Sequence, residues 1–387
     1  MAISLPTLFS IGRLIPFADT LATFLCIVVL VLEQGLKRRH FVKYVVIVCL
    51  FVASDFMYPK TDAHIAHIKC LIIMFLCMDA VYSDLYDRMR IVIQRYASFI
   101  TGQLMVIMLL NVAFIFTSAG YSDRYSAEWA LDAYRGIYSD PHQCAYHVCA
   151  LLVILLQVSR VNFRNFHWLI LAGLEYCTFL TGARVPTVLA LFIGLVYVLD
   201  HMPRMAGEND IRNLLLKGGI ILVITAGVLY FVMRYTTFGA KMLTSAISGS
   251  FDNGRGNLRK RDLLLLGQSD LLQILFGHGT DGVIDYHGSF VYATYIWSHN
   301  DFMQMLCGMG LPMLCIYCWS WLKLLRRAAH ESKLSVMTVV LLMGVAFFNG
   351  LYIHVRFTFV MPLLLFYMGE RLTKRRKDPM WKQEAAP

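Results

Sequence analysis

The chain has 387 residues, of which 58% are hydrophobic and only 16% are charged, and its formal net charge is +10. Soluble domains carry about 25% charged residues, so the composition excludes an ordinary soluble protein and indicates one that crosses a membrane many times. The excess of Lys and Arg lies in short connections between apolar segments, which is typical of membrane orientation signals rather than of nucleic-acid binding.

Apolar segments long enough to cross the bilayer recur along the chain. They predict an all-α polytopic membrane protein, a single transmembrane domain over 1–387 with about eleven spans, or about ten to twelve. The start of the chain has no basic region and no small-residue cleavage site, so we expect no removable signal peptide. The predicted spans are 15–32, 44–57, 67–82, 99–117, 144–158, 168–180, 185–199, 218–233, 302–322, 334–349 and 357–368.

Charge predicts which side of the membrane each connection faces. With eleven spans, most Lys and Arg fall on one side together with the polar tail 371–387, and that side is cytoplasmic by the positive-inside rule. The first outer loop 118–142, the large polar segment 237–298 and the tight turn 181–184 then face outward. The segment 237–298 is cationic and rich in glycine, so we expect it to carry part of the active site.

Arg184 is the strongest candidate for an anion ligand in this outer set. It lies in the TGAR turn between two spans, where an arginine is costly unless it is paired or binds a ligand. The planar guanidinium binds phosphate oxygens in pairs and stays charged. For the other outer cations, contact with lipid headgroups or simple solvation is the alternative interpretation.

His299 is the candidate for proton transfer. It lies in SHND, where the outer segment re-enters the membrane, and an imidazole can take a proton from a sugar hydroxyl. Asp301 would orient it, although residues two apart do not face each other on a helix. The alternative is a helix start, with Ser298 or Asn300 as the N-cap and Asp301 in the first turn, and both interpretations can hold.

FGHG at 276–279 is too short for a nucleotide-binding loop, so we assign its glycines to tight turns and close backbone approach. The histidines and carboxylates show no metal-ligand spacing, and we expect no metal site.

Several short motifs together resemble the O-antigen polymerase and ligase family, over about half of the chain from 135 to 320. Arg259 stands where that family usually has a tryptophan, and His142 follows the Asp-Pro pair where the family has asparagine. The matching motifs are AYRGIYSDPHQCA at 133–145, TGARVPTVLALFIG at 181–194, NGR at 253–255, FGHG at 276–279, SHND at 298–301 and GMGLP at 308–312.

This resemblance implies a glycosyltransferase of the C superfamily in the bacterial inner membrane, with its site facing the periplasm. It would act without a metal or cofactor, on a glycan donor carried by undecaprenyl pyrophosphate and a lipid-linked glycan acceptor, by inverting attack of a sugar hydroxyl. A chain-length regulator is a further expected partner. By position, the resemblance assigns pyrophosphate binding to Arg184, Arg255 and Arg135, the reacting hydroxyl to His299, and supporting roles to Asp140, Asn300, Asp301 and Arg259.

A repeat-unit polymerase is favoured over a ligase that transfers glycan to lipid A core, because polymerases are the more numerous members. A transporter of lipid-linked glycan is the alternative from another class. Transporters usually place polar groups near the bilayer midplane in repeated halves, whereas here the charges lie at the outer ends and no internal repeat is seen. The enzyme hypothesis predicts that Arg135, Arg184, Arg255 and His299 converge.

Overall fold

The structure is a computed structural model. It describes residues 24–25, 27–32, 38–58, 62–81, 84–122, 132–201, 227, 230–248, 255–289 and 297–377. Most of these residues are helical, so the predicted α-helical class is confirmed, with one pair of two-residue strands as the exception. The predicted spans 15–32 and 218–233 and the end of the tail lie largely outside the described residues.

The chain divides into two compact units, which we describe separately. The central unit comprises Tyr96–Asn253 with Met1–Asp19, and the flanking unit comprises Thr20–Arg95 with Gly254–Pro387. Arg135 and Arg184 therefore belong to one unit, and Arg255 and His299 to the other. The convergence of all four stays a prediction.

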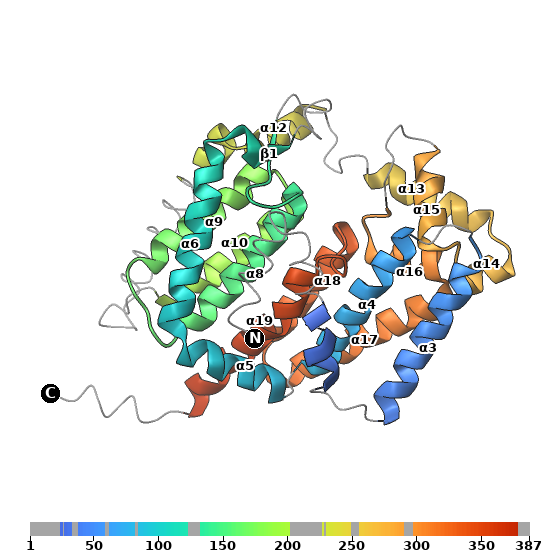
Figure 1. The fold of residues 1–387 in the computed structure, drawn as a ribbon, viewed down its shortest axis with the longest axis horizontal. Helices are drawn as coiled ribbons and strands as arrows, with labels where there is room; N and C mark the ends of the chain where they lie inside the picture. The colour runs from blue at the N-terminus through green and yellow to red at the C-terminus, as the bar shows by residue number, and fades with distance from the viewer. Residues whose placement is uncertain are drawn as a thin grey trace. The chain divides into compact units, whose positions relative to one another are not determined.

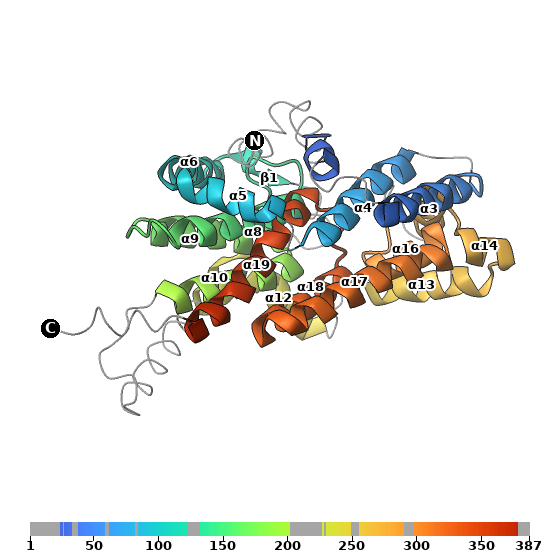
Figure 2. The same ribbon diagram turned by 90° about the horizontal axis from the view of Figure 1, so that it is seen from below.

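The central unit is built around one buried helix, α8, which packs against three other helices of the unit. Asp140 caps α8 by accepting from the amides of His142 and Gln143, and Pro141 occupies its first turn, where its missing N–H costs nothing. Seen from below, α8 and α9 lie between α6 and α10 (Figure 2). The helices of this unit are α6 (Ala97–Ile115), η1 (Ser118–Gly120), α8 (Pro141–Ser159), α9 (His167–Thr181), α10 (Arg184–His201) and α12 (Thr237–Ser248).

The predicted outer loop 118–142 contains a short antiparallel ladder of β1 (Tyr121–Ser122) and β2 (Ala133–Tyr134). The hydroxyl of Tyr134 donates to the backbone carbonyl of Asn111 in α6, which fastens the ladder to the helix bundle. This ladder is the departure from an all-helical chain within the described residues.

The flanking unit joins segments from both ends of the chain (Figure 1, blue and orange to red). Helix α19 packs along α4 and also contacts α5, α17 and α18. The helices of this unit are α3 (Arg38–Asp55), α4 (Asp62–Ala80), α5 (Asp84–Arg95), α13 (Arg255–Gly267), α14 (Leu271–Phe276), α15 (Thr280–Gly288), α16 (Asp301–Met309), α17 (Leu311–Glu331), α18 (Lys333–Phe348) and α19 (Val355–Lys377).

Two predicted elements differ from the structure. The predicted span 302–322 is interrupted at Gly310, whose φ of 83° ends α16 and begins α17. The polar segment 237–298, which we predicted as a large outer loop, is largely helical where it is described. It contains α12, α13, α14 and α15, and leucines recur in α13 and α14.

Three described helices, α6, α8 and α10, are long and apolar enough to cross a membrane, or four crossings are present if α4 and α5 together form one bent span. The count of eleven spans stays a prediction.

Both ends of α4 make polar contacts with other segments of the flanking unit. Near the end of α4, Asp79 accepts from Lys43 Nζ at 3.0 Å, and Lys323 Nζ lies 3.6 Å from the same carboxylate. His67, near the other end of α4, hydrogen-bonds Tyr352, which lies in the connection between α18 and α19.

Candidate active site in the flanking unit

Two glycine motifs meet in the flanking unit, backbone against backbone. The amide of His278 donates to the carbonyl of Cys307 at 2.7 Å. Gly277 lies against the backbone of Gly308 and Met309, and Gly310 lies against the backbone of Leu275, so a Cβ at either position would clash. The predicted role of the FGHG glycines in close backbone approach is therefore confirmed, and GMGLP is its counterpart.

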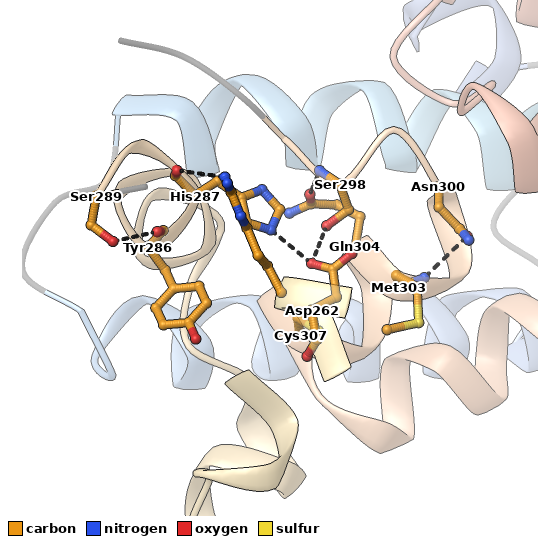
Figure 3. Close-up of polar contacts among 10 residues, drawn as sticks. Asp262, Tyr286, His287, Ser289, Ser298, Asn300, Met303, Gln304 and Cys307 are labelled. Carbon is orange, nitrogen blue, oxygen red and sulfur yellow. Dashed lines mark hydrogen bonds and ion pairs between the residues drawn. The ribbon is translucent and has the colours of Figure 1, made fainter. Parts of the chain in front are cut away.

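The start of α16 matches the predicted helix N-terminus. Asn300 is the N-cap, and its side-chain oxygen accepts from the amides of Phe302 at 3.0 Å and Met303 at 3.2 Å. The contact with Met303 is drawn in Figure 3. Asn300 thus begins the helix directly after His299.

Asp301 serves a different purpose from the one expected. Its fully buried carboxylate accepts from the backbone amides of Leu351, at 2.9 and 3.0 Å, and Tyr352, at 3.3 Å, and from the Tyr317 hydroxyl at 2.7 Å. These contacts fasten the connection between α18 and α19 to the start of α16. Asp301 anchors the backbone beside His299 and does not bond to the imidazole.

His299 has a left-handed backbone, with φ at 49°, and no other non-glycine residue described by the structure has a positive φ. Such a conformation costs about 1–3 kcal/mol and persists only where the surroundings enforce it. The side chain is partly exposed, whereas Ser298 and Asn300 on either side of it are buried. A partly exposed histidine, whose Nδ1 atom is buried, is therefore held between two fixed neighbours.

Trp297 lies beside His299 and packs in turn against His67 and Tyr352. The indole of Trp297 lies 4.8 Å from the His299 ring and 6.1 Å from that of His67, measured between ring centroids. Tyr352 lies 6.2 Å from the same indole. A Cβ on Gly350 would strike the Trp297 ring, so glycine is required for this packing.

A buried carboxylate holds the residue before His299. Asp262, in α13, accepts at one oxygen, Oδ1, from Ser298 Oγ and from His287 Nε2, both at 3.0 Å (Figure 3). The amide of Ser298 donates to Gln304 Oε1 at 3.2 Å. Asp262 and His287 are fully buried and Ser298 is 2% exposed, so this network braces the backbone away from solvent.

Arg255 and Arg259 lie one helical turn apart on α13, and both contact the end of α18. Arg255 donates to the carbonyl of Phe348 at 2.7 Å and to Asn349 Oδ1 at 2.5 Å. The guanidinium of Arg259 lies 4.9 Å from the ring centroid of Phe347 and 5.3 Å from that of Phe348. Cations suit this place because the last carbonyls of a helix carry partial negative charge.

In the central unit, Arg184 begins α10 and ties α12 to the TGAR turn. Its guanidinium donates to the backbone carbonyl of Lys241 at 3.1 Å and to the Ser245 hydroxyl. The Lys241 ammonium reaches the same turn, because a Cβ on Gly182 would lie 3.0 Å from Nζ, and Lys241 is only 5% exposed. Two cations thus occupy this turn.

The other two candidates of the central unit lie in and after the ladder segment. The amide of Arg135 bonds the Gly120 carbonyl at 2.8 Å, and its Nε donates to the Ala119 carbonyl at 3.4 Å. Asp140 caps α8, as described above. These contacts give both residues roles in backbone structure.

Sequence reasoning missed several residues of the site, namely Trp297 beside the imidazole, His67 and Tyr352 against Trp297, and Asp262 with His287, which bond at the residue before His299. Trp297 is two residues from His299, but the contacts of the others join parts of the chain that are distant in sequence, so no local motif predicts them. Asp262 is a single carboxylate among leucines in RDLLLL, which is a weak signal that the residue is buried for a reason.

His278 is the titratable group at the meeting of the glycine motifs. Its Nε2 lies 2.7 Å from Ser269 Oγ. Burial lowers the pKa of His278 below its ordinary value, and Asp270 opposes that shift in part.

No protein-family model matches this chain, and no curated protein matches it either.

Proposed function

We propose that the chain is a membrane glycosyltransferase that polymerises oligosaccharide repeat units carried on undecaprenyl pyrophosphate, with His299 next to the attacking hydroxyl. The observation that carries the proposal is the backbone of His299. Residues with a strained backbone that is enforced by their surroundings cluster at functional sites, where the strain keeps a reactive group in place. The motifs that resemble the O-antigen polymerase and ligase family supply the reaction class.

The chemistry divides into two tasks. The acceptor hydroxyl must lose a proton as it attacks the anomeric carbon, and a partly exposed imidazole is suited to receive it. The pyrophosphate must leave as its negative charge grows, and fixed cations stabilise that charge best when they are already in place. Arg184 and Arg255 are our proposed cations, with Arg135 as a third.

The membrane supplies the remaining part of the catalysis. Donor and acceptor are both lipid-linked and therefore lie at the same depth, so the enzyme gains mainly by orienting them. Attack opposite the leaving pyrophosphate inverts the anomeric centre. Neither a nucleotide sugar nor a metal is needed in this scheme.

Complementation tests the proposal. A host strain without the chain is supplied with His299→Ala or Arg184→Ala, and its surface glycan and lipid-linked glycan are separated by length. The matched controls are His330→Ala, an exposed histidine of α17, and Arg164→Ala, an exposed arginine after α8. Loss of long chains with single units still on the acceptor supports a polymerase.

Two other outcomes would count against a polymerase. Loss of all glycan on the acceptor, with polymer accumulating on its lipid carrier, supports the ligase instead. Unchanged glycan in both site variants, at normal protein levels, contradicts both reactions.

A further inference from the structure

The residue that precedes His299 is fixed at both of its polar groups. Ser298 donates its hydroxyl to Asp262 Oδ1 at 3.0 Å and its amide to Gln304 Oε1 at 3.2 Å. With both donors satisfied by buried acceptors, the Trp297–Ser298 peptide and the Ser298 side chain each have one preferred orientation. On the other side of His299, Asn300 caps α16, so the imidazole projects from a segment fixed at each end.

One oxygen atom of Asp262 connects three separate elements. Asp262 lies in α13, and its Oδ1 accepts hydrogen bonds from His287 of α15 and from Ser298 of the segment before α16 (Figure 3). The thiol of Cys307 in α16 also contacts the Asp262 carbonyl, at 3.8 Å. A shift of any one element therefore moves the acceptor of Ser298.

The second carboxylate oxygen of Asp262, Oδ2, makes it possible to test whether the position or the charge of this side chain matters. Oδ2 is buried and makes no hydrogen bond to any described residue. An asparagine could thus keep both bonds at Oδ1 and place its amide group where Oδ2 now lies. An alanine would lose both bonds.

Resting on the proposed function, we infer that Asp262 is a positioning residue that sets the conformation of His299 through Ser298. Asp262 is fully buried, so we assign it no direct contact with substrate. Its task is geometric: it holds the Ser298 hydroxyl, and Ser298 in turn holds the left-handed backbone of His299.

Chemical labelling tests this independently of glycan synthesis. The full-length protein in detergent is treated with diethyl pyrocarbonate at pH 7, and the modification rate of His299 is followed by mass spectrometry, with His201 in the central unit as internal reference. Ser298→Ala should change the His299 rate by about threefold or more, because loss of one bond frees the backbone. Ser289→Ala is the matched control, since that exposed hydroxyl bonds only the Tyr286 carbonyl nearby.

The kinetics of glycan transfer by the same variants complete the test. Loss of the bond should lower kcat about tenfold or more with KM nearly unchanged, because small misplacements of a reacting group cost rate rather than binding. Asp262→Asn should retain the wild-type labelling rate and kcat, whereas Asp262→Ala should change the His299 labelling rate and lower kcat as Ser298→Ala does. An asparagine variant as impaired as the alanine variant would overturn a geometric role, and so would a Ser298→Ala protein identical to wild type.

The two proposals fail in different ways. If His299→Ala abolishes glycan synthesis while Ser298→Ala changes neither labelling nor kcat, this inference is wrong and the proposed function stands. If Ser298→Ala alters His299 labelling while His299→Ala leaves the glycan unchanged, the positioning is real but the proposed function is wrong.

Discussion

Arg255 donates a hydrogen bond of 2.7 Å to the carbonyl of Phe348, at the end of α18. The same guanidinium reaches Asn349 Oδ1, so it joins the first turn of α13 to the connection that Asp301 also anchors. The cation that the family resemblance assigns to pyrophosphate thus already holds the flanking unit together near His299.

Mutation can separate the structural role of Arg255 from its proposed role in binding phosphate. Arg255→Ala should cost about 1.5–3 kcal/mol of stability because it removes charged hydrogen bonds to the end of α18. Asn349→Ala removes one of these bonds and leaves the cation in place. If Arg255 also binds phosphate, its alanine variant should reduce surface glycan far more than Asn349→Ala does at equal protein level. Equal losses would limit Arg255 to its structural role.

Gly310 should tolerate no side chain. Gly310→Ala should destabilise the protein by about 2 kcal/mol or more, because alanine is strained at a φ of 83° and its Cβ would strike the Leu275 backbone. Gly344, within α18, has nothing within 4 Å of its Cβ position, so Gly344→Ala should be neutral or stabilising by about 1 kcal/mol. Thermal unfolding in detergent compares the two, and similar melting temperatures would refute the packing of these motifs.

His278 should make the flanking unit sensitive to acid. Its pKa is lowered in the folded state, so the folded protein binds fewer protons at this site than the unfolded chain does. The neutral form of His278 therefore favours the folded protein. This contribution to the free energy of unfolding is fully present above the ordinary histidine pKa of about 6.5, and it is lost as the pH falls through the lowered pKa of the folded state. Thermal unfolding between pH 7 and pH 5 should show a steeper loss in wild type than in His278→Gln. Parallel curves would contradict the assignment.

Glu175 is a buried carboxylate in the middle of α9, and neither of its oxygens has a hydrogen-bond partner among the described residues. A buried polar group without a partner destabilises a fold, so Glu175→Leu should raise the unfolding temperature. Glu331→Leu, at the exposed end of α17, is the control and should change little. A large loss of stability in Glu175→Leu would show that the carboxylate has a partner that stabilises it.

The sequence predicted what depends on local pattern. Apolar segments located α6, α8, α9, α10 and α18 within a few residues, and Asn300 was among the proposed caps because a short polar side chain before a helix is a local signal.

Long-range contacts could not be predicted in this way. We predicted the polar segment 237–298 as a loop, because its helices are short and are separated by polar residues and glycines. The break at Gly310 depends on the backbone of Leu275, far away in the chain. Asp262, His287 and Ser298 meet only after folding, so His299 could be proposed from sequence but its support could not.

The most direct test of the central claim is the length distribution of lipid-linked and surface glycan in a host carrying His299→Ala, compared with His330→Ala at equal protein level. The account predicts that His299→Ala leaves only single repeat units on the acceptor while His330→Ala makes chains of normal length. Chains of normal length in both variants would contradict it.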